Sequence, residues 1–226
     1  MGLWGIEAPL IPLPGGHRNH VFRAGSYVLK STRRSAAALA WLGPLHTAAE
    51  AAGLVAPRLI PSTRGNISEA GWTCEPFIAG TPGTKADLAA LPLAALHRAT
   101  ATLPQRPGFT AAADLVAREA AGDVDLSAMP SDLADACHAA WEALAPLPRA
   151  AIHGDISPHN LIRTPEGRLA LIDWDEARCD ATVFDTGSTD PAIARALTAW
   201  EIAVCWDLEP ERAGRLASGF APRSAP

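Results

Sequence analysis

The sequence has 226 residues, of which 48% are hydrophobic and 19% are charged. This is enough apolar material for one large domain or two small lobes with a substantial core. The 19 basic and 24 acidic residues give a net charge of −5. Because a mildly acidic chain is a poor candidate for binding nucleic acid or an anionic membrane surface, we expect neither kind of partner.

The cysteines and the N-terminal segment are typical of a cytoplasmic protein. The first residues lack the basic start and the long apolar stretch of a secretory signal. No apolar run approaches the ~18 residues that a membrane span needs. The four cysteines are far apart and form no Cys-x-x-Cys pair, so we expect reduced thiols in the core: Cys74, Cys137, Cys179 and Cys205.

A β-hairpin is predicted near the N-terminus. Two alternating apolar segments, residues 21–23 and 27–30, flank a turn at residues 24–26. Ahead of the hairpin lie Gly15 and Gly16, whose backbone N–H groups could approach phosphate oxygens because glycine has no side chain to prevent it. A pair of glycines is also common in ordinary turns, so both interpretations stay open.

Lys30 ends this hairpin and is a rare residue type in the chain. There are 17 arginines but only two lysines, Lys30 and Lys85. A lysine retained at a strand end in such an arginine-rich chain is a candidate functional residue. The alternative is a solvated lysine on an edge strand.

Residues 34–52 are rich in alanine and carry a broad apolar face, which predicts a helix interrupted at Gly43 and Pro44. Two further strands are predicted at residues 58–60 and 72–78. The proline and glycine between residues 76 and 80 mark a boundary. We therefore expect a β-rich N-terminal lobe at residues 1–78 and a second lobe at residues 79–226.

The second lobe is predicted to be mainly helical. One helix carries His97, which we expect to be a packing or surface histidine. Helical periodicity and capping residues predict further helices at residues 111–121, from Ser131 onward, after Asp190-Pro191, and after Glu209-Pro210. In the helix that begins at Ser131, apolar residues recur at helical spacing and are expected to be core.

The stretch at residues 151–175 carries most of the candidate chemistry. It contains Asp155, then Asn160, then Asp173, with a turn signal at residues 164–167 between two apolar runs. This pattern predicts a second β-hairpin, which would bring the three polar side chains together at one end. Two carboxylates and an amide that converge on loops require a cation or a transferable proton.

Phosphoryl transfer uses both. One aspartate orients the attacking hydroxyl and takes its proton, while an asparagine and a second aspartate hold Mg²⁺ on the nucleotide phosphates. The spacing His153-x-Asp155-x₄-Asn160, followed by a strand that ends in Asp173, resembles the kinase catalytic arrangement. With Asp-Trp-Asp at residues 173–175, the sequence resembles the aminoglycoside phosphotransferase and choline kinase-like family over residues 10–190, most densely at 151–185.

The resemblance implies an α+β, two-lobed, protein-kinase-like fold with a small antiparallel β-rich N-lobe and a mainly helical C-lobe. It also implies a small-molecule kinase that transfers the γ-phosphoryl group of ATP or GTP, with Mg²⁺, to a hydroxyl group. The acceptor would be an aminoglycoside-, choline- or homoserine-like molecule. The partners would be the nucleotide and this acceptor.

The resemblance assigns roles to the residues of the motif. Asp155 would be the catalytic base, and His153 would support its loop. Asn160 and Asp173 would bind Mg²⁺, and Asp175 would support a second metal ion or the substrate.

Further roles follow from the resemblance outside this motif. Lys30 would bind the α- and β-phosphates as a compact charge. The linker that contains Glu75 and Phe77 would bind adenine through its backbone. Asp185 would hold the catalytic loop in place.

The sequence departs from the family pattern in one respect. In the family, a helix glutamate pairs with the strand lysine, but residues 35–38 contain no acid and Glu50 comes late in the helix. Either Glu50 replaces the missing glutamate, or Lys30 is held in another way.

Two other function classes compete with the kinase. A metal-dependent hydrolase could draw its ligands from His153, Asp155, His159, Asp173 and Asp175, although it leaves Lys30 unexplained. A non-catalytic nucleotide-binding module is favoured by the missing glutamate. The intact set of Asp155, Asn160 and Asp173 argues against this module.

Overall fold

The computed structural model describes residues 2–13 and 19–220. The chain forms two compact units. The first unit contains the residues up to Leu96 together with Asp155–Asp175, and the second contains His97–Gly154 together with the residues from Glu176 onward. The expected lobe boundary after residue 78 stays a prediction. Among the described residues, no helix is both long enough and apolar enough to cross a membrane.

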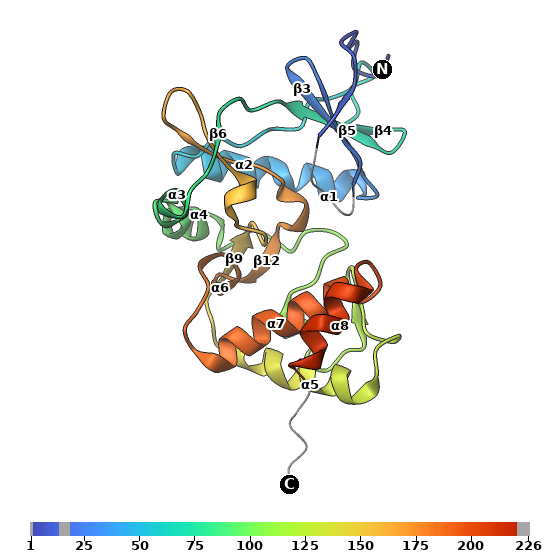
Figure 1. The fold of residues 1–226 in the computed structure, drawn as a ribbon, viewed down its shortest axis with the longest axis vertical. Coiled ribbons are helices and arrows are strands. Elements are labelled where there is room, and N and C mark those ends of the chain that lie inside the picture. Colours follow the sequence, from blue (N-terminus) through green and yellow to red (C-terminus); the bar gives the residue numbers. More distant parts are fainter. Residues whose placement is uncertain (1, 14–18, 221–226) are drawn as a thin grey trace. The chain divides into compact units, whose positions relative to one another are not determined.

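The first unit is built on a five-stranded antiparallel sheet (Figure 1). The strand order is β1-β2-β3-β5-β4. The strands are β1 (Ile11–Pro12), β2 (Val21–Ala24), β3 (Tyr27–Ser31), β4 (Ser68–Glu69) and β5 (Trp72–Pro76). The predicted N-terminal hairpin is confirmed, because β2 and β3 pair around a turn in which Gly25 has a φ of 62°.

The register of β3 and β5 separates the two faces of this sheet. Leu29 lies opposite Cys74, and Lys30 lies opposite Thr73. Directly paired residues share a face, and neighbours along a strand alternate between faces. Leu29 and Cys74 belong to a small hydrophobic cluster with Ile6. The ammonium of Lys30 is therefore presented on the face away from that cluster.

The predicted strand at residues 58–60 is wrong. These residues make one backbone hydrogen bond to the sheet, from the N–H of Ile60 to the carbonyl oxygen of Cys74 at 2.7 Å, but they form no strand. Pro57 and Pro61 flank the segment, and proline has no N–H to donate to a ladder.

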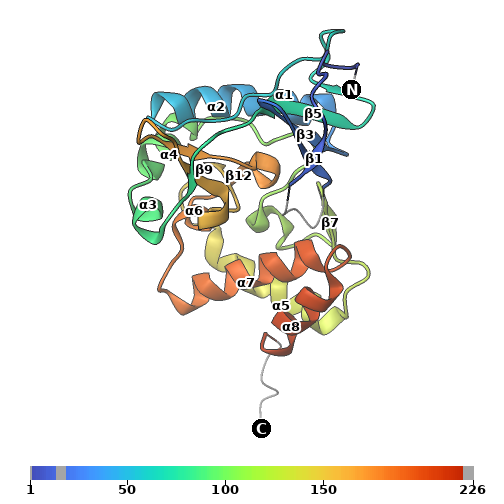
Figure 2. The ribbon, with the colours of Figure 1, turned by 45° about the horizontal axis from the view of Figure 1, so that its top comes forward.

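The helix predicted at residues 34–52 is present as α1 (Ala36–Ala40) and α2 (Leu42–Ala51), which lie against the sheet (Figures 1 and 2). The interruption falls at Trp41 and not at the predicted Gly43 and Pro44. Pro44 occupies the first turn of α2, where backbone N–H groups have no acceptor within the helix. Proline is tolerated there, and the break shifts to the residues before it.

The second predicted hairpin is confirmed within the first unit. β10 (Leu161–Arg163) pairs antiparallel with β11 (Leu169–Leu171), and β10 also pairs with β6 (Thr81–Pro82). Two glycines permit the close approach of β6, because a Cβ on Gly83 would lie 2.7 Å from the Leu161 side chain and one on Gly80 would lie 2.2 Å from a carbonyl oxygen. The helices α3 (Lys85–Ala89) and α4 (Leu93–Thr100) follow β6.

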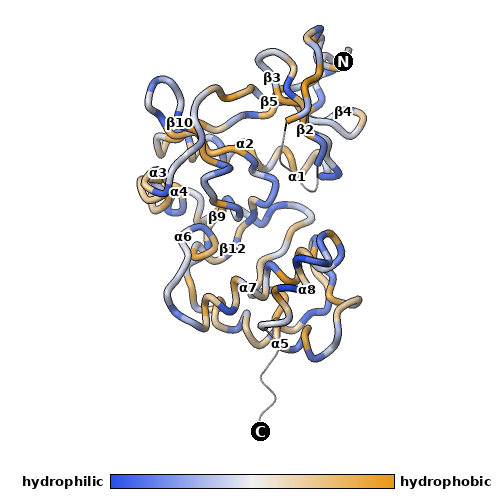
Figure 3. Tube along the Cα trace, in the orientation of Figure 1, coloured by the Kyte–Doolittle hydropathy of each residue, from blue (hydrophilic) through white to orange (hydrophobic). Residues whose placement is uncertain are grey.

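The second unit combines two β-ribbons with helices (Figure 2). β9 is hydrophobic along most of its length (Figure 3). The ribbons pair β9 (Arg149–Ile152) with β12 (Arg178–Ala181) and β7 (Ala120–Ala121) with β8 (Val124–Asp125). The α-helices are α5 (Ser131–Trp141), α6 (Val183–Thr186), α7 (Pro191–Cys205) and α8 (Pro210–Ser218).

The helix predicted at residues 111–121 is wrong. Only a 3₁₀ turn forms there, at Ala112–Leu115, and the chain then enters β7. The N–H of Ala112 donates to the buried carboxylate of Asp180 at 3.1 Å, and Gly122 turns the chain with a φ of 59°. These tertiary contacts override the helix propensity of an alanine-rich segment.

The predicted cap is wrong for one of the other helices and confirmed for another. Ser131 does not cap α5, because Pro130 holds the capping position. Asp190 does cap α7, and its carboxylate accepts from the N–H of Ala192 at 2.8 Å.

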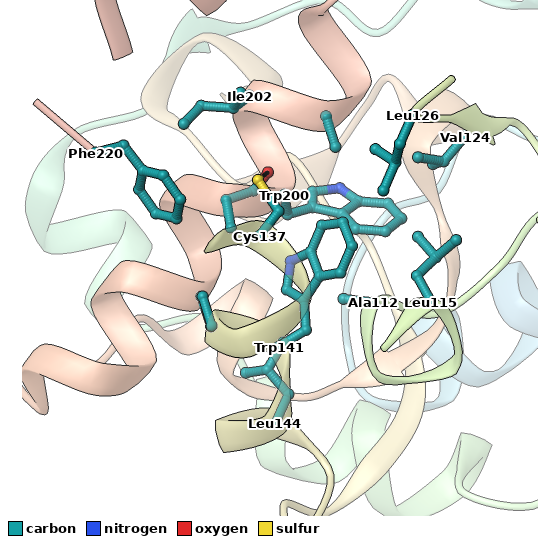
Figure 4. Packing of buried hydrophobic residues seen from close by; sticks show 14 of the residues in the cluster. Ala112, Leu115, Val124, Leu126, Cys137, Trp141, Leu144, Trp200, Ile202 and Phe220 are labelled. Carbon is teal, nitrogen blue, oxygen red and sulfur yellow. Dashed lines mark hydrogen bonds between the residues drawn. The ribbon is translucent and has the colours of Figure 1, made fainter. Parts of the chain in front are cut away.

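The core of the second unit is aromatic at its centre (Figure 4). Trp141 of α5 is fully buried and meets Trp200 of α7 edge-on, with 6.3 Å between the ring centroids. Phe184 contacts Trp200 in the same manner at 5.7 Å. The guanidinium of Arg178 lies 4.0 Å from the centroid of the Trp200 ring and pairs with Asp180 at 2.9 Å. The core thus joins α5, α6, α7 and β12.

Replacing Trp141 with alanine is expected to lower the free energy of unfolding by about 3–5 kcal/mol, because the large cavity left in this core cannot fully collapse. Urea unfolding followed by circular dichroism measures the change. Leu208→Ala is the control, since Leu208 is 59% exposed and its truncation should change stability by less than about 0.5 kcal/mol. A loss below about 1 kcal/mol for Trp141→Ala would contradict the packing described.

Candidate functional site

The open end of the β10–β11 hairpin brings Asn160 and Asp173 together. The ladder extends one step past the two strands, because the N–H of Ile172 donates to the carbonyl oxygen of Asn160 at 2.9 Å. Asp173 is the next residue along the chain. Both polar residues therefore leave the hairpin at the same end, as the turn signal at residues 164–167 predicted.

Asp155 joins them through Asn160. The side-chain amide of Asn160 donates to the Asp155 carboxylate at 2.8 Å and to the Asp155 carbonyl oxygen at 2.9 Å. Asp155 itself is exposed. Since the amide nitrogen of Asn160 faces Asp155, its amide oxygen is the group that can face a cation. The hairpin thus holds an oriented carboxylate that solvent or a substrate can reach.

The backbone at Asp173 is strained. Its φ is 63°, in the left-handed region that residues other than glycine rarely adopt. The next residue, Trp174, is buried, and its indole N–H donates to the carbonyl oxygen of Leu171 at 2.8 Å. Its ring lies edge-on to His46 of α2, 5.1 Å away. Strained conformations of this kind persist where the surroundings fix them, and they concentrate at functional sites.

Lys30 is held by the two aspartates that flank Trp174. Its ammonium bonds to Asp173 and lies 3.0 Å from the carboxylate of Asp175. Burial alone would lower the pKa of Lys30, but the carboxylates of Asp175 and then Asp173 more than offset this and raise it above its ordinary value. The lysine is therefore a fixed positive charge.

Glu50 does not take the place of the missing helix glutamate. Its carboxylate forms a two-pronged ion pair with Arg58, at 2.8 and 2.6 Å. The sequence left open whether Glu50 or some other group pairs with Lys30. The partners of Lys30 are the two aspartates after β11, Asp173 and Asp175.

Lys30, Asp173 and Asp175 line one small cavity in the first unit, between the inner face of the sheet, the helices α1 and α2, and the segment after β11. Its walls are polar on the sheet and hairpin sides and apolar on the α1 side. The lining residues are Lys30, Thr32, Leu39, Leu42, His46, Leu59, Thr73, Glu75, Asp173, Trp174 and Asp175.

The side chain of Glu75 belongs to this cavity. Glu75 lies two residues after Thr73 on β5, so strand alternation puts it on the same face as Lys30. Burial of the carboxyl raises the pKa of Glu75 to about 8; Lys30 opposes this shift, and Asp173 and Asp175 reinforce it. The carboxyl is thus mostly protonated at neutral pH and able to donate a hydrogen bond.

Phe77, which was also predicted to bind the nucleotide, is not among the described residues that line this cavity. The N–H of Phe77 donates to the carbonyl oxygen of Ser26 at 2.8 Å, and its ring lies under the guanidinium of Arg23 at 3.9 Å. The N–H of Phe77 is therefore already paired with the backbone of the β2–β3 turn. Gly15 and Gly16 lie outside the described residues.

His153 lies in the second unit and is fully buried. Its backbone N–H and that of Gly154 donate to the carboxylate of Asp185, at 3.0 and 2.9 Å. Nε2 of His97 lies 2.8 Å from the same carboxylate. Asp185 therefore fixes the backbone that leads into Asp155, the role expected for it from the resemblance.

Sequence reasoning missed two residues of this arrangement. Of the two alternatives expected for His97, the packing one is confirmed, but its pairing with the buried Asp185 was missed; its position after Leu-x-x-Leu, as in the resembled family, was the available signal. Asn19 donates its side-chain amide to Asp175. Nothing in the local sequence around Asn19 indicates a partner 156 residues away.

The donor set suits a hard divalent cation. Asn160 supplies an amide oxygen and Asp173 a carboxylate, and oxygen ligands of this kind are those that Mg²⁺ prefers. Within residues 2–13 and 19–220, no group of three or more histidine, cysteine, aspartate and glutamate side chains is arranged to hold a metal ion. Asn160 falls outside those four residue types.

Comparison with known proteins identifies the family. The model of the phosphotransferase enzyme family matches residues 9–216. The chain belongs to this family. Its members are phosphotransferases of the aminoglycoside phosphotransferase and choline kinase type, which act on hydroxyl groups of small molecules. No curated protein matches the chain.

Solved structures of this family share the fold. The choline kinase LicA from Streptococcus pneumoniae aligns with a TM-score of 0.60 and 16% identity, over 94% of this chain and 92% of that one. The GDP and kanamycin complex of APH(2")-IIia gives a TM-score of 0.58 and 14% identity, over 96% and 91%. Spectinomycin phosphotransferase APH(9)-Ia, in complex with ADP and spectinomycin, gives 0.55 and 14%, over 97% and 92%. The kinase-like α+β fold expected from the sequence is confirmed.

The buried carboxyl of Glu75 makes stability depend on pH. A carboxyl whose pKa rises from about 4.5 to about 8 on folding binds a proton more tightly in the folded state. The free energy of unfolding therefore falls as the pH rises from 4.5 through 8. Glu75→Gln lacks this titration, so its stability relative to wild type should increase between pH 5.5 and 8.5, by on the order of 1–3 kcal/mol.

Urea unfolding at several pH values measures this difference. Glu119→Gln is the matched control, because it makes the same chemical change at an exposed position. Parallel pH profiles for wild type and Glu75→Gln would show that the Glu75 carboxyl is not buried as described.

Proposed function

We propose that this chain transfers the γ-phosphoryl group of a nucleoside triphosphate, ATP in the first instance, to a hydroxyl group of a small molecule in a Mg²⁺-dependent reaction. The observation that carries the proposal is the convergence of Lys30, Asp155, Asn160 and Asp173 within one compact unit, from two separate stretches of chain. One fixed cation, one accessible carboxylate and one pair of oxygen ligands are the groups that phosphoryl transfer requires.

The residues divide the chemistry between them. Lys30 binds phosphate oxygens as a compact charge. Asp155, oriented by Asn160, accepts a hydrogen bond from the acceptor hydroxyl and takes its proton as the hydroxyl oxygen attacks the γ-phosphorus. The bond from that phosphorus to the bridging oxygen breaks, and the nucleoside diphosphate leaves. The proton passes from Asp155 to solvent.

The amide oxygen of Asn160 and the carboxylate of Asp173 would hold Mg²⁺ beside the phosphates. When bound, this ion neutralises charge on the phosphate oxygens. The left-handed backbone of Asp173 supports this role, because the surrounding Trp174 and Leu171 contacts keep a strained residue in place. His153 supports the backbone that leads into Asp155, because its own N–H donates to the carboxylate of Asp185.

The structural neighbours bear on the choice of nucleotide and acceptor. APH(2")-IIia was solved with GDP and kanamycin, and spectinomycin phosphotransferase with ADP. We therefore propose that both ATP and GTP be tested as donors, with aminoglycosides, choline and homoserine as the first acceptors.

Wild-type protein is expected to bind ATP or GTP much more tightly with Mg²⁺ than without it. Asp173→Ala should lose most of this Mg²⁺ dependence, and its phosphoryl transfer should fall at least ~100-fold, because the missing carboxylate leaves the phosphates unneutralised and misplaced. Isothermal titration calorimetry with each nucleotide, with and without Mg²⁺, measures binding. Nucleoside diphosphate release in the presence of each acceptor measures transfer.

Two control variants separate binding from chemistry. Asp155→Asn should keep nucleotide affinity within about threefold while transfer falls at least ~100-fold, since the base is lost and the nucleotide contacts remain. Asp207→Ala, which removes an exposed carboxylate of the second unit, should match wild type in both assays. Stabilisation by Zn²⁺ or Mn²⁺ alone, with no nucleotide binding, would overturn the proposal in favour of a hydrolase.

A non-catalytic nucleotide-binding module is less well supported. The missing helix glutamate favoured it, but Lys30 has other carboxylate partners in Asp173 and Asp175. The module would be supported instead if wild-type protein bound nucleotide tightly but transferred phosphate to no acceptor faster than Asp155→Asn does.

A further inference from the structure

The helix wall of the cavity offers Lys30 no counter-charge. Leu39, Leu42 and His46 line this wall at helical spacing, and residues 36–49 contain no aspartate or glutamate. Glu50 ends the helix in its ion pair with Arg58. A buried ammonium requires a compensating charge from its surroundings. For Lys30 that charge has to come from another element.

The segment after β11 supplies it twice. Asp173 and Asp175 both contact the ammonium of Lys30, and Trp174 between them is buried against His46. The anchored indole sets the direction of the short 3₁₀ turn Trp174–Glu176, so that both carboxylates line the same cavity. The two aspartates are thus alike in their contact with Lys30.

Their other contacts differ. Asp173 follows the Ile172–Asn160 backbone bond and so lies beside the amide that completes an oxygen donor set. Asp175 instead accepts from the side chain of Asn19. Asn19 immediately precedes His20, whose N–H and carbonyl oxygen both bond to Ser31 at the end of β3. Asp175 therefore connects to the hairpin that carries Lys30 at two points.

We propose that Asp175 is a positioning residue that holds Lys30 toward the nucleotide phosphates, in place of a helix glutamate, and that Asp173 is left to bind the metal ion. This inference rests on the proposed function and narrows the role of Asp175, which the family resemblance assigned to a second metal ion or the substrate. When a cation takes Asp173, the Lys30 ammonium still has one carboxylate, and its position is maintained.

Carboxylate-to-amide variants separate the two roles. In Asp175→Asn, the affinity for ATP at saturating Mg²⁺ should fall at least ~10-fold. The Mg²⁺ concentration that gives half of the maximal Mg²⁺ effect, measured with the same fraction of protein bound to ATP, should change less than ~3-fold. In Asp173→Asn, the Mg²⁺ half-saturation should rise at least ~10-fold. Asp207→Asn is the matched control for an exposed carboxylate. A large Mg²⁺ shift in Asp175→Asn would overturn the inference and make Asp175 a metal ligand.

A second-site variant tests replacement directly. Leu42→Glu introduces a carboxylate on the helix wall of the same cavity and leaves His46 in contact with Trp174. In the Asp175→Asn background it should restore ATP affinity to within about threefold of wild type, because Lys30 regains a partner from α2. Failure of the rescue in a folded double variant would count against the positioning role, and circular dichroism establishes that the variant is folded.

A measurement without nucleotide keeps this inference distinct from the proposed function. The chain has only two lysines, so amine labelling followed by mass spectrometry reports Lys30 with Lys85, which is exposed, as the internal reference. Because Asp173 still bonds to Lys30 in Asp175→Asn, the labelling is compared in an Asp173→Asn background. In that background the ratio of Lys30 to Lys85 labelling should rise at least ~5-fold when Asp175→Asn is added and stay unchanged when Asp207→Asn is added. An unchanged ratio on adding Asp175→Asn would overturn the contact. If wild type binds no nucleotide, the proposed function fails, and the labelling ratio still decides whether Asp175 holds Lys30.

Discussion

The first unit depends on the burial of one ammonium group. Lys30 lies on the inner face of a small sheet, and a cation in that position is unfavourable unless carboxylates surround it. The carboxylates of Asp173 and Asp175 arrive from a hairpin more than 140 residues later in the chain. The pairing of β10 with β11, the anchored Trp174 and the apolar wall of α1 and α2 all serve to hold these charges in one small volume. Loss of the ion pairs would leave three uncompensated charges in that volume.

The neutral form of Glu75 fits the same constraint. With Lys30 shared by two aspartates, a third negative charge in the same cavity would be repelled and poorly solvated. Burial and these neighbours raise the pKa of the Glu75 carboxyl to about 8, and the group stays protonated near neutral pH. The cavity therefore keeps a small net negative charge before any ligand binds, and this favours entry of a divalent cation.

Much of the site could be predicted from sequence because its signals are local. The turn at residues 164–167 fixes a hairpin register, and the register alone brings Asn160 and Asp173 to one end. The position of Lys30 followed from a short alternating strand. The partners of Lys30 could not be predicted in this way, since they depend on how distant elements pack, and the sequence shows only that the helix lacks an acid. Glu75 was expected in a linker. It is instead part of β5, where it pairs with Val28 of β3, and its side chain is on the same face of the sheet as Lys30. The helix expected at residues 111–121 failed for a related reason: the buried Asp180 accepts the N–H of Ala112, a contact that no local propensity contains.

The first unit is assembled from two stretches of chain, with most of the second unit encoded between them. During synthesis, the sheet, α1 and α2 leave the ribosome well before the hairpin that completes them. Until residues 161–171 emerge, β6 has no strand to pair with, and Val55 lacks its backbone bonds to Leu169 and Leu171. Lys30 likewise has neither Asp173 nor Asp175 as a partner until that part of the chain has been synthesised. The nascent N-terminal region therefore spends an interval with an unpaired strand edge and an unneutralised cavity, a state in which chains are prone to aggregate and in which chaperones act.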